Sequence, residues 1–248
     1  TADGMYAGGV STLTGHGCSS SVVTGCNIRA GSYAGGLAGR HTASTGSVII
    51  RDCAIYAEEY AGGVFGMKDA ETGDHYLYNA IVTNCKIGRT TKEYPETEKN
   101  PDNPDRYTPQ WKTGNGRGTR FAGGLVGESH GARYYNSVVD DSVEVKASQY
   151  GGGGFGRFGG GESHDLHIGA TVKVDGNYAG GLAGELIGYD QSLKGANLLR
   201  YPVTKLQRMI LSGSVEGNAA VGGLTGFFTP GERPVDPEDG SQIADETS

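Results

Sequence analysis

Three carboxylates stand close together in the middle of the chain, at Asp140, Asp141 and Glu144. Acidic side chains on neighbouring outward positions of a sheet can act as general acid and general base, as they do in polysaccharide hydrolases and lyases. Asp140 and Asp141, however, occupy the place where other segments carry Asp52 or Asn84. A turn with side-chain hydrogen bonds to the backbone explains that placement without catalysis. We therefore expect no catalytic residue and no enzyme, and a carbohydrate-active hydrolase or lyase is the alternative hypothesis.

The histidines, glycines and acidic clusters do not form a known metal or phosphate motif. His164 and His167 are three residues apart but lie beside an expected strand, and the chain has no His-Glu-x-x-His pair. The glycine-rich segment 151–161 lacks the Gly-Lys-Ser/Thr ending of a phosphate-binding loop. The acidic stretches 102–105 and 236–239 lack the spacing of an EF-hand, so solvated loops are favoured over calcium sites. The sequence predicts no metal and no cofactor.

The composition argues against two classes of partner. The formal net charge is −7 and the isoelectric point is about 5.4, with no cluster of Lys and Arg, so we expect neither nucleic-acid binding nor an anionic membrane surface. No apolar run approaches the roughly 20 residues of a membrane span, so we expect no membrane insertion within this chain. The first residues do not resemble a signal peptide. Because the chain starts at Thr1 inside a repeat, we expect a piece of a longer protein.

Three of the four cysteines occupy one position of a repeating pattern: Cys26, Cys53 and Cys85. In stacked strands these side chains would form a column with a spacing of about 4.8 Å. Parallel side chains in register suit disulfide geometry poorly, so the expectation is a core column of buried free thiols. Cys18 lies outside this repeated position and is the one other candidate for a disulfide partner. No CxxC pair accompanies the cysteines, which argues against zinc.

A glycine-rich motif sets the period of the chain, and its clearest copy is Tyr-Ala-Gly-Gly-Leu-Ala-Gly at residues 178–184. The other copies begin at Tyr6, Tyr33, Tyr60, Phe121, Tyr150 and Ala220. Successive copies are 27, 27, 61, 29, 28 and 42 residues apart, so a unit near 27 residues is interrupted twice by insertions. Recurrence in register at this period predicts a solenoid, in which each unit buries its apolar side against its neighbours.

Each unit reads as three short strands and no helix. In the second unit the strands are 34–39, 47–50 and 53–56, separated by a polar turn and a two-residue corner. No unit shows the 3.6-residue periodicity of a helix. The predicted fold class is therefore all-β, a right-handed parallel β-helix of about seven coils of roughly 27 residues, built by residues 1–229 as a single domain. Right-handedness follows from the crossover preference of parallel strands.

Two insertions and a tail depart from the unit. The insertion at 88–120 holds four of the eight prolines and the only tryptophan, and we expect a loop at one corner. The insertion at 185–207 is apolar enough to pack on the solenoid or to form a short helix, and 230–248 reads as an acidic, Pro-containing linker or tail. Recognition concentrates in loops on rigid scaffolds, so the first insertion is the candidate binding site, with tolerated disorder as the alternative. Its candidate ligand-binding residues are Trp111, Tyr107, Tyr94 and Arg106.

The glycine-rich strand itself predicts an uncharged outer strip. If the Leu or Val of each motif faces the core, strict alternation turns the residue after it outward. The resulting column is Ala38, Phe65, Val126, Phe155, Ala183 and Thr225. We expect insertion 185–207 to cover this strip, or the strip to serve as a packing face for a partner or a second copy. Two residues after Val126, Phe155 and Ala183 of this column stand Glu128, Arg157 and Glu185. Their charges alternate in sign, which predicts salt bridges between neighbouring units.

The motif and the cysteine corner together resemble the GLUG repeat of bacterial surface proteins. The resemblance rests on the Gly-Gly-Leu-x-Gly segments 35–39, 123–127, 180–184 and 222–226, with Asp52-Cys53 and Asn84-Cys85 between them, and it covers nearly all of residues 6–226. The first copy departs from it at Thr12 and the fifth at Gly154. GLUG repeats occur in adhesin-like proteins and in the non-catalytic region of IgA-cleaving metallopeptidases.

The resemblance implies an extracellular location, either secreted or attached to the cell surface of a bacterium. With no catalytic motif in the chain, we expect a non-catalytic repeat domain that acts as an adhesin-type binding module for cell adhesion or as a stalk. The implied partner is a host or microbial surface glycan or protein, and self-association is a further expectation. A purely structural spacer is a third hypothesis.

Overall fold

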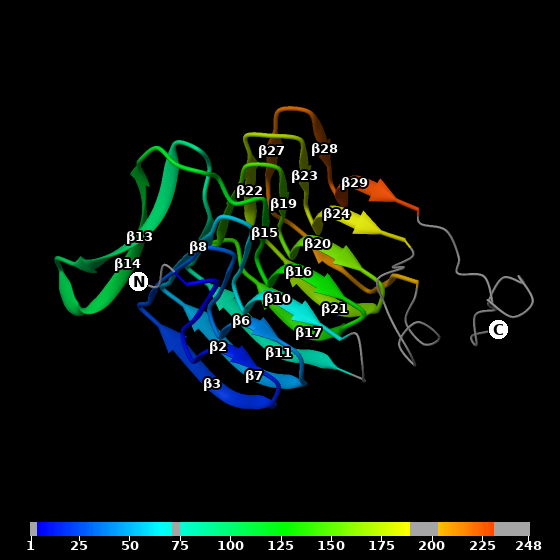
Figure 1. Cartoon of the computed structure of the whole chain (residues 1–248), viewed down its shortest axis with the longest axis horizontal. Helices are drawn as coiled ribbons and strands as arrows, with labels where there is room; N and C mark the ends of the chain where they lie inside the picture. Colours follow the sequence, from blue (N-terminus) through cyan, green and yellow to red (C-terminus); the bar gives the residue numbers. More distant parts are fainter. Residues whose placement is uncertain (1–3, 71–74, 189–202, 231–248) are drawn as a thin grey trace, which may run out of the picture.

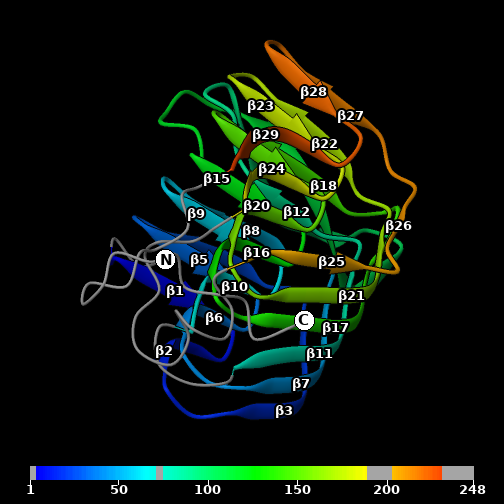
Figure 2. The same ribbon diagram turned by 90° about the vertical axis from the view of Figure 1, so that its right-hand side faces the viewer.

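The computed structural model describes residues 4–70, 75–188 and 203–230. These residues form strands and turns, without helix, as the sequence predicts. The strands build four parallel sheets, named A to D here in the order in which the chain visits them, and one two-stranded antiparallel sheet. Figures 1 and 2 show the sheets running along the molecule, with each repeat stacked on the one before it.

Sheet A is formed by the aromatic-small-Gly triplets of the repeated motif. Each triplet pairs in parallel with the equivalent triplet of the next repeat, for example Tyr6 with Tyr33 and Tyr33 with Tyr60. The register predicted from the motif is therefore confirmed. The strands are β1 (Tyr6–Gly8), β5 (Tyr33–Gly35), β9 (Tyr60–Gly62), β15 (Phe121–Gly123), β19 (Tyr150–Gly152), β23 (Tyr178–Gly180) and β28 (Ala220–Gly222).

Sheet B begins after a two-residue turn, so the single strand predicted at 34–39 is in fact two strands. The break falls at Gly36 and Leu37, where a Cβ on Gly36 would lie 2.1 Å from the carbonyl oxygen of Gly63. Only glycine allows the stacked turns to approach so closely. The strands are β2 (Ser11–Thr14), β6 (Ala38–His41), β10 (Phe65–Asp69), β16 (Val126–His130), β20 (Phe155–Gly159), β24 (Ala183–Ile187) and β29 (Thr225–Thr229).

Sheet C contains the longest strands of the repeats. Each of its first five strands has one residue with positive φ, and the equivalent residue of the last repeat lies between two short strands. Ser, Asn and Asp occupy five of these six positions, in keeping with their tolerance of the left-handed region. The residues are Ser20, Ser47, Asn79, Asn136, Asp165 and Arg208. The strands are β3 (Cys18–Thr24), β7 (Thr45–Arg51), β11 (Tyr76–Thr83), β17 (Arg133–Val139), β21 (Glu162–Ile168), β25 (Lys205–Gln207) and β26 (Ile210–Leu211).

Sheet D follows a tight corner at which Gly25, Asp52 and Asn84 have positive φ. This is the small polar corner predicted before each cysteine. The strands are β4 (Asn27–Ala30), β8 (Ala54–Ala57), β12 (Lys86–Gly88), β18 (Glu144–Ala147), β22 (Thr171–Val174) and β27 (Val215–Gly217). After sheet D the chain returns to sheet A one repeat further on, and this path is compatible with a parallel β-helix.

The predicted uncharged outer strip is wrong, because its residues lie in the core. Five of its six members are fully buried, and Thr225 of the last repeat is half-buried. The turn at Gly36 and Leu37 interrupts the alternation, so Ala34 and Ala38 both face inward while the aromatic ring of the motif faces outward. The buried members are Ala38, Phe65, Val126, Phe155 and Ala183.

The insertion at 88–120 contains an antiparallel hairpin instead of the predicted loop. Its strands are β13 (Glu93–Asn100) and β14 (Asn103–Thr113). Within the second insertion, β24 ends at Ile187 and β25 begins at Lys205. The predicted helix or packing segment falls largely on residues 189–202, and the predicted tail falls on 231–248, which lie outside the described residues.

Candidate functional site

The hairpin β13–β14 is built from residues that are poor strand formers elsewhere. Pro95 pairs with Trp111, and Pro109 pairs with Thr97. Proline is tolerated here because each strand of a two-stranded ribbon is an edge strand. One side of its backbone makes no hydrogen bonds to a further strand, so a missing N–H costs nothing there. At the tip, the amide of Asp102 donates to the side-chain oxygen of Asn100 at 2.9 Å, an Asx turn.

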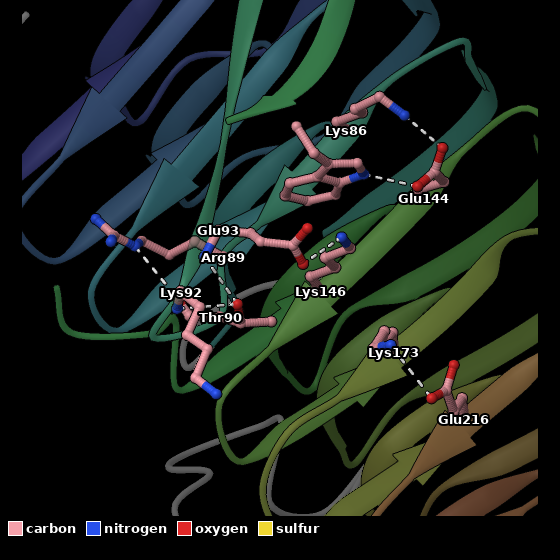
Figure 3. A network of polar contacts seen from close by, with 10 residues as sticks. Lys86, Arg89, Thr90, Lys92, Glu93, Glu144, Lys146, Lys173 and Glu216 are labelled. Carbon is pink, nitrogen blue, oxygen red and sulfur yellow. Dashed lines mark hydrogen bonds and ion pairs between the residues drawn. The ribbon is translucent and has the colours of Figure 1, made fainter. Parts of the chain in front are cut away.

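The base of the hairpin is fixed by Thr90 and Thr119, which stand where the chain leaves and rejoins the repeat. The Thr90 hydroxyl accepts hydrogen bonds from the amides of Lys92 and Glu93 at 3.2 and 3.0 Å (Figure 3). The amide of Thr119 donates to the carbonyl of Arg89 at 2.9 Å and so closes the insertion. Positions on either side of the insertion thereby keep their places in the repeat.

Trp111 attaches the hairpin to the outer face of sheet D. Its indole N–H donates to Oε2 of Glu144 at 2.6 Å, and Nζ of Lys146 lies 4.1 Å from the ring centroid. Glu144 also forms an ion pair with Lys86, the residue beside it on β12. Figure 3 shows Lys86 and Glu144 with this ion pair drawn as a dashed line. Burial tends to raise the pKa of Glu144, but the hydrogen bonds from Lys86 and Trp111 hold it below its ordinary value.

An ion pair also joins the hairpin to β18, the strand that carries Glu144. Nζ of Lys146 lies 2.7 Å from Oε2 of Glu93, and the lysine side chain is only 11% exposed. A lysine this deeply covered needs a carboxylate, because leaving its charge unpaired would cost several kcal/mol. The hairpin supplies that carboxylate.

The far half of the hairpin lies over β4 and β8. Arg29 forms an ion pair with Glu96 at 2.8 Å, and its guanidinium lies 5.4 Å from the ring of Tyr56 and 5.7 Å from the ring of Tyr94. Tyr107 covers Gly25, where a Cβ would meet the tyrosine ring at 2.8 Å. The hairpin therefore contacts strands from four successive repeats.

The four candidate ligand-binding residues divide into anchors and exposed groups. Trp111 and Tyr94 are half-buried against residues of sheet D and the hairpin base. Tyr107 is 38% exposed and Arg106 is exposed. The structure thus gives the aromatic rings a positioning role, and the ligand-binding role of these residues stays a prediction.

A polar surface pocket of about 460 Å³ opens at the base of the hairpin. Its charged lining residues are Glu58, Glu59, Arg117 and Arg120, and Ser148 and Gln149 complete one wall. Arg117 and Glu58 are 3.6 Å apart and strongly exposed, so their ion pair adds little stability. Glu59, Arg120 and Gln149 each precede an aromatic residue of sheet A. The pocket consequently lies beside that aromatic row.

The aromatic residues of sheet A form a stacked ladder on its outer side. Ring centroids of neighbouring repeats are 4.7 to 5.3 Å apart from Tyr6 to Tyr178. Next to the ladder, Glu128 and Arg157 are 2.9 Å apart, and Arg157 and Glu185 are 3.1 Å apart. The predicted alternating row is confirmed. Burial tends to raise the pKa of Glu128, but His130 and Arg157 hold it below its ordinary value.

The cysteines are free thiols, and two of the predicted column are fully buried. Cys53 and Cys85 donate to the carbonyls of Arg51 and Thr83 at 3.1 and 3.2 Å. Cys26 is half-buried because the neighbouring strand β4 is the edge of sheet D. Burial raises the pKa of the Cys26 and Cys85 thiols.

Two of the three carboxylates considered for catalysis, Asp140 and Glu144, are held by neighbouring groups. Asp140 accepts a hydrogen bond from the amide of Ser142 at 3.0 Å, while Asp141 is exposed. Glu144 belongs to the hairpin anchor. Within 4–70, 75–188 and 203–230, no group of three or more His, Cys, Asp or Glu could hold a metal ion. No helix in the same ranges is long and apolar enough to cross a membrane.

Sequence reasoning missed the sheet D residues that receive the hairpin, chiefly Lys86, Lys146 and Arg29. Each is a cation on a strand of sheet D, which a covering segment that carries Glu would match. The insertion carries Glu93 and Glu96, but their partners are more than fifty residues distant along the chain. Comparison with known proteins found no matching family model, no matching curated protein and no matching solved structure.

Proposed function

We propose that this chain is a right-handed parallel β-helix that acts as a non-catalytic binding module of a secreted or wall-attached bacterial surface protein. The four parallel sheets in repeat register support the fold, and the crossover preference of parallel strands supports the hand. The GLUG-like segments support the bacterial surface location. The proposed partner is a host or microbial surface glycan or protein.

The observation that carries the binding function is the way the hairpin is held. Three ion pairs or charge-assisted bonds and two aromatic contacts fix it on sheet D. A segment ordered before binding loses less entropy when a partner docks, so it binds more tightly than a free loop of equal size. A mere spacer would gain nothing from such an insertion.

The pairing of Glu144 supports a non-catalytic role. A general acid or base must exchange a proton with substrate, whereas this carboxylate is engaged by Lys86 and by the Trp111 indole. Its lowered pKa agrees with a carboxylate that stays ionised in its pair with Lys86.

The test replaces residues 88–120 by Tyr-Ala-Glu-Glu, the four residues that join Ile55 to Tyr60 in the preceding repeat. Ile87 and Phe121 are in register with Ile55 and Tyr60, so this hairpin-swap variant closes the repeat without the insertion. We expect the fold to persist by circular dichroism and binding to at least part of an array of surface glycans and proteins to be lost. Binding equal to that of the original chain would refute the hairpin as the contact surface.

A further inference from the structure

The outer face of sheet C carries a row of mainly aliphatic side chains that are exposed or half-buried. In β3, β7, β11, β17 and β26, two consecutive aliphatic residues point one outward and one inward, as in Ile81, which is 41% exposed, and Val82, which is fully buried. On β21 the pair is His167 and Ile168. Val22 and Ile210 at the two ends of the row are 58% and 61% exposed. The outward row, in strand register, is Val22, Ile49, Ile81, Val138, His167 and Ile210.

Aromatic rings form a second row on the same face, three residues earlier in the strands. Tyr78, Tyr135 and His164 are in register, and the ring centroids of Tyr135 and His164 are 4.1 Å apart. Tyr76 adds a ring 5.6 Å from that of Tyr78. These rings are half-buried, so each keeps part of its surface open to solvent.

Polar groups without charge run between the two rows in the first four strands. Asn79 and Asn136 have exposed side chains, and the amide of Asn136 donates to that of Asn79 at 2.7 Å. Ser20 and Ser47 continue the line on β3 and β7. The middle positions of these strands therefore combine ring faces, amides and hydroxyls and carry no charged side chain.

A pocket of about 230 Å³ is hollowed into this face. Tyr76 and Tyr78 form one side, and Ser19, Ser44 and Cys18 contribute to the other. The pocket depends on Gly46, because a Cβ there would lie 2.1 Å from the ring of Tyr78. The glycine thus lets the tyrosine ring lie flat against the sheet.

We infer that the outer face of sheet C binds a neutral glycan chain, with one sugar held in the pocket beside Tyr78. The apolar face of a pyranose ring matches the face of an aromatic ring, and its hydroxyls match serine and asparagine groups. A nucleic acid or a polyanion would need a series of unpaired lysines or arginines along the row. Instead, Arg133 lies over the rings of Tyr76 and Tyr135, and Arg208 is paired with Asp165. A protein partner is less suited, because the polar line between the two rows breaks the apolar patch that a stable interface would bury.

This inference rests on the proposed binding function for its ligand class, but it uses a face other than the hairpin. The probes are the neutral hexasaccharides cellohexaose and mannohexaose, with heparin as the anionic comparison, each titrated calorimetrically into the full chain. We expect saturable binding of at least one neutral hexasaccharide and none of heparin at equal concentration. Tyr78→Ala should weaken that binding about tenfold or more, because it removes the stacking surface.

The matched controls are Tyr107→Ala, which removes a tyrosine from the hairpin, and the hairpin-swap variant. Both should bind the hexasaccharide as the original chain does. If the hairpin-swap variant loses the sugar and Tyr78→Ala keeps it, the proposed function stands and the sheet C site is wrong. Binding of neither neutral sugar also overturns the inference. So does a concentration-dependent dimer that Tyr78→Ala abolishes, because the face would then serve a second copy.

One measurement does not depend on any variant folding. Hydrogen exchange of the original chain, with and without cellohexaose or mannohexaose, should show added protection confined to β11, β17 and the strands beside them. Protection located on β13 and β14 instead would contradict the site. Gly46→Ser offers a further check, since its side chain displaces the Tyr78 ring and should weaken sugar binding while both tyrosines remain.

Discussion

Sheets C and D share one parallel architecture, yet their outer faces are completed in different ways. On sheet D, Lys86, Glu144 and Lys146 point outward and are paired with one another or with the hairpin. On sheet C, the middle outward positions of β3, β7, β11 and β17 are uncharged, and Val22 and Ile81 remain exposed to solvent. The composition of the outward positions therefore distinguishes a face that carries its own covering from a face that is left open.

The physical reason lies in the cost of covering a charge. Once the hairpin lies on sheet D, water can no longer solvate Lys146 fully, so a carboxylate must accompany the covering segment. Glu93 meets that need at 2.7 Å. An open face has no such requirement and can retain apolar and amide groups for a ligand. Four predictions test this contrast.

The largest effect should separate two neighbours on β11. Val82→Lys buries an ammonium group without a partner, and we expect a loss of more than about 4 kcal/mol, enough to prevent stable folding. Ile81→Lys should change stability by no more than about 0.5 kcal/mol, because its side chain reaches solvent. Urea unfolding measures both variants. Comparable losses at the two positions would show that the outer face of sheet C is covered.

The second-largest effect concerns Lys68, a buried lysine on a strand that the hairpin does not cover. Lys68 on β10 is fully buried, donates to the carbonyl of Ala43, and has a pKa lowered to about 7 by burial. In the unfolded chain the same amine titrates near 10.4. Between these values the unfolded state binds the extra proton, so the stability contribution of Lys68 rises with pH.

Lys68→Met removes this titration. The unfolding free energy of the original chain minus that of the variant should rise by roughly 3 kcal/mol between pH 7 and about 9.5. Below pH 7 the difference should level off, because both states are then protonated. Urea unfolding at a series of pH values checks the slope, and a difference that does not change with pH would show that Lys68 is charged in the folded protein.

The register between neighbouring repeats could be predicted from the sequence, because the same residue types recur in each repeat. The aromatic and glycine positions fixed the register of sheet A, and the residues before Cys53 and Cys85 marked the corner. Glu128, Arg157 and Glu185 could be paired from register alone. Each of these features recurs at a nearly constant spacing, so neighbours in space are known once the period is known.

Features that depend on a turn within the motif or that lie in an insertion could not be predicted in this way. The turn at Gly36 and Leu37 reverses which side chains face the core, and strict alternation assumes a strand that does not turn. The prolines of the hairpin argued against strands, although a two-stranded ribbon accepts them at its edges. Trp111 meets Glu144 from within an insertion, where sequence spacing gives no register.

A smaller effect should follow from loosening the hairpin. Trp111→Ala removes the indole hydrogen bond to Glu144 and the ring beneath Lys146, and we expect a loss of roughly 2 kcal/mol. Trp111→Phe keeps a ring for Lys146 and should lose about half as much. Hydrogen exchange should show faster exchange in β13 and β14 and little change in sheet C. Equal acceleration in both regions would mean that the hairpin stabilises the whole fold.

The smallest effect should come from a more exposed ion pair of the same hairpin, and it tests whether pairing matters only under a cover. Lys112 and Glu98 form an ion pair there with side chains 35% and 52% exposed, whereas the Lys146 side chain is 11% exposed in its pair with Glu93. Water solvates the first pair whether or not it forms, and salt screens it, so Lys112→Ala should leave the thermal midpoint unchanged. Lys146→Ala should lower the midpoint, because Glu93 would remain against sheet D without its cation and Trp111 would lose its ammonium contact. Raising the salt concentration should reduce neither difference appreciably, since the covered pair is poorly screened and the open one contributes nothing to lose. If Lys112→Ala proved as damaging as Lys146→Ala, the hairpin would owe its order to its own cross-strand pairs, and the contrast between a covered sheet D and an open sheet C would lose its physical basis.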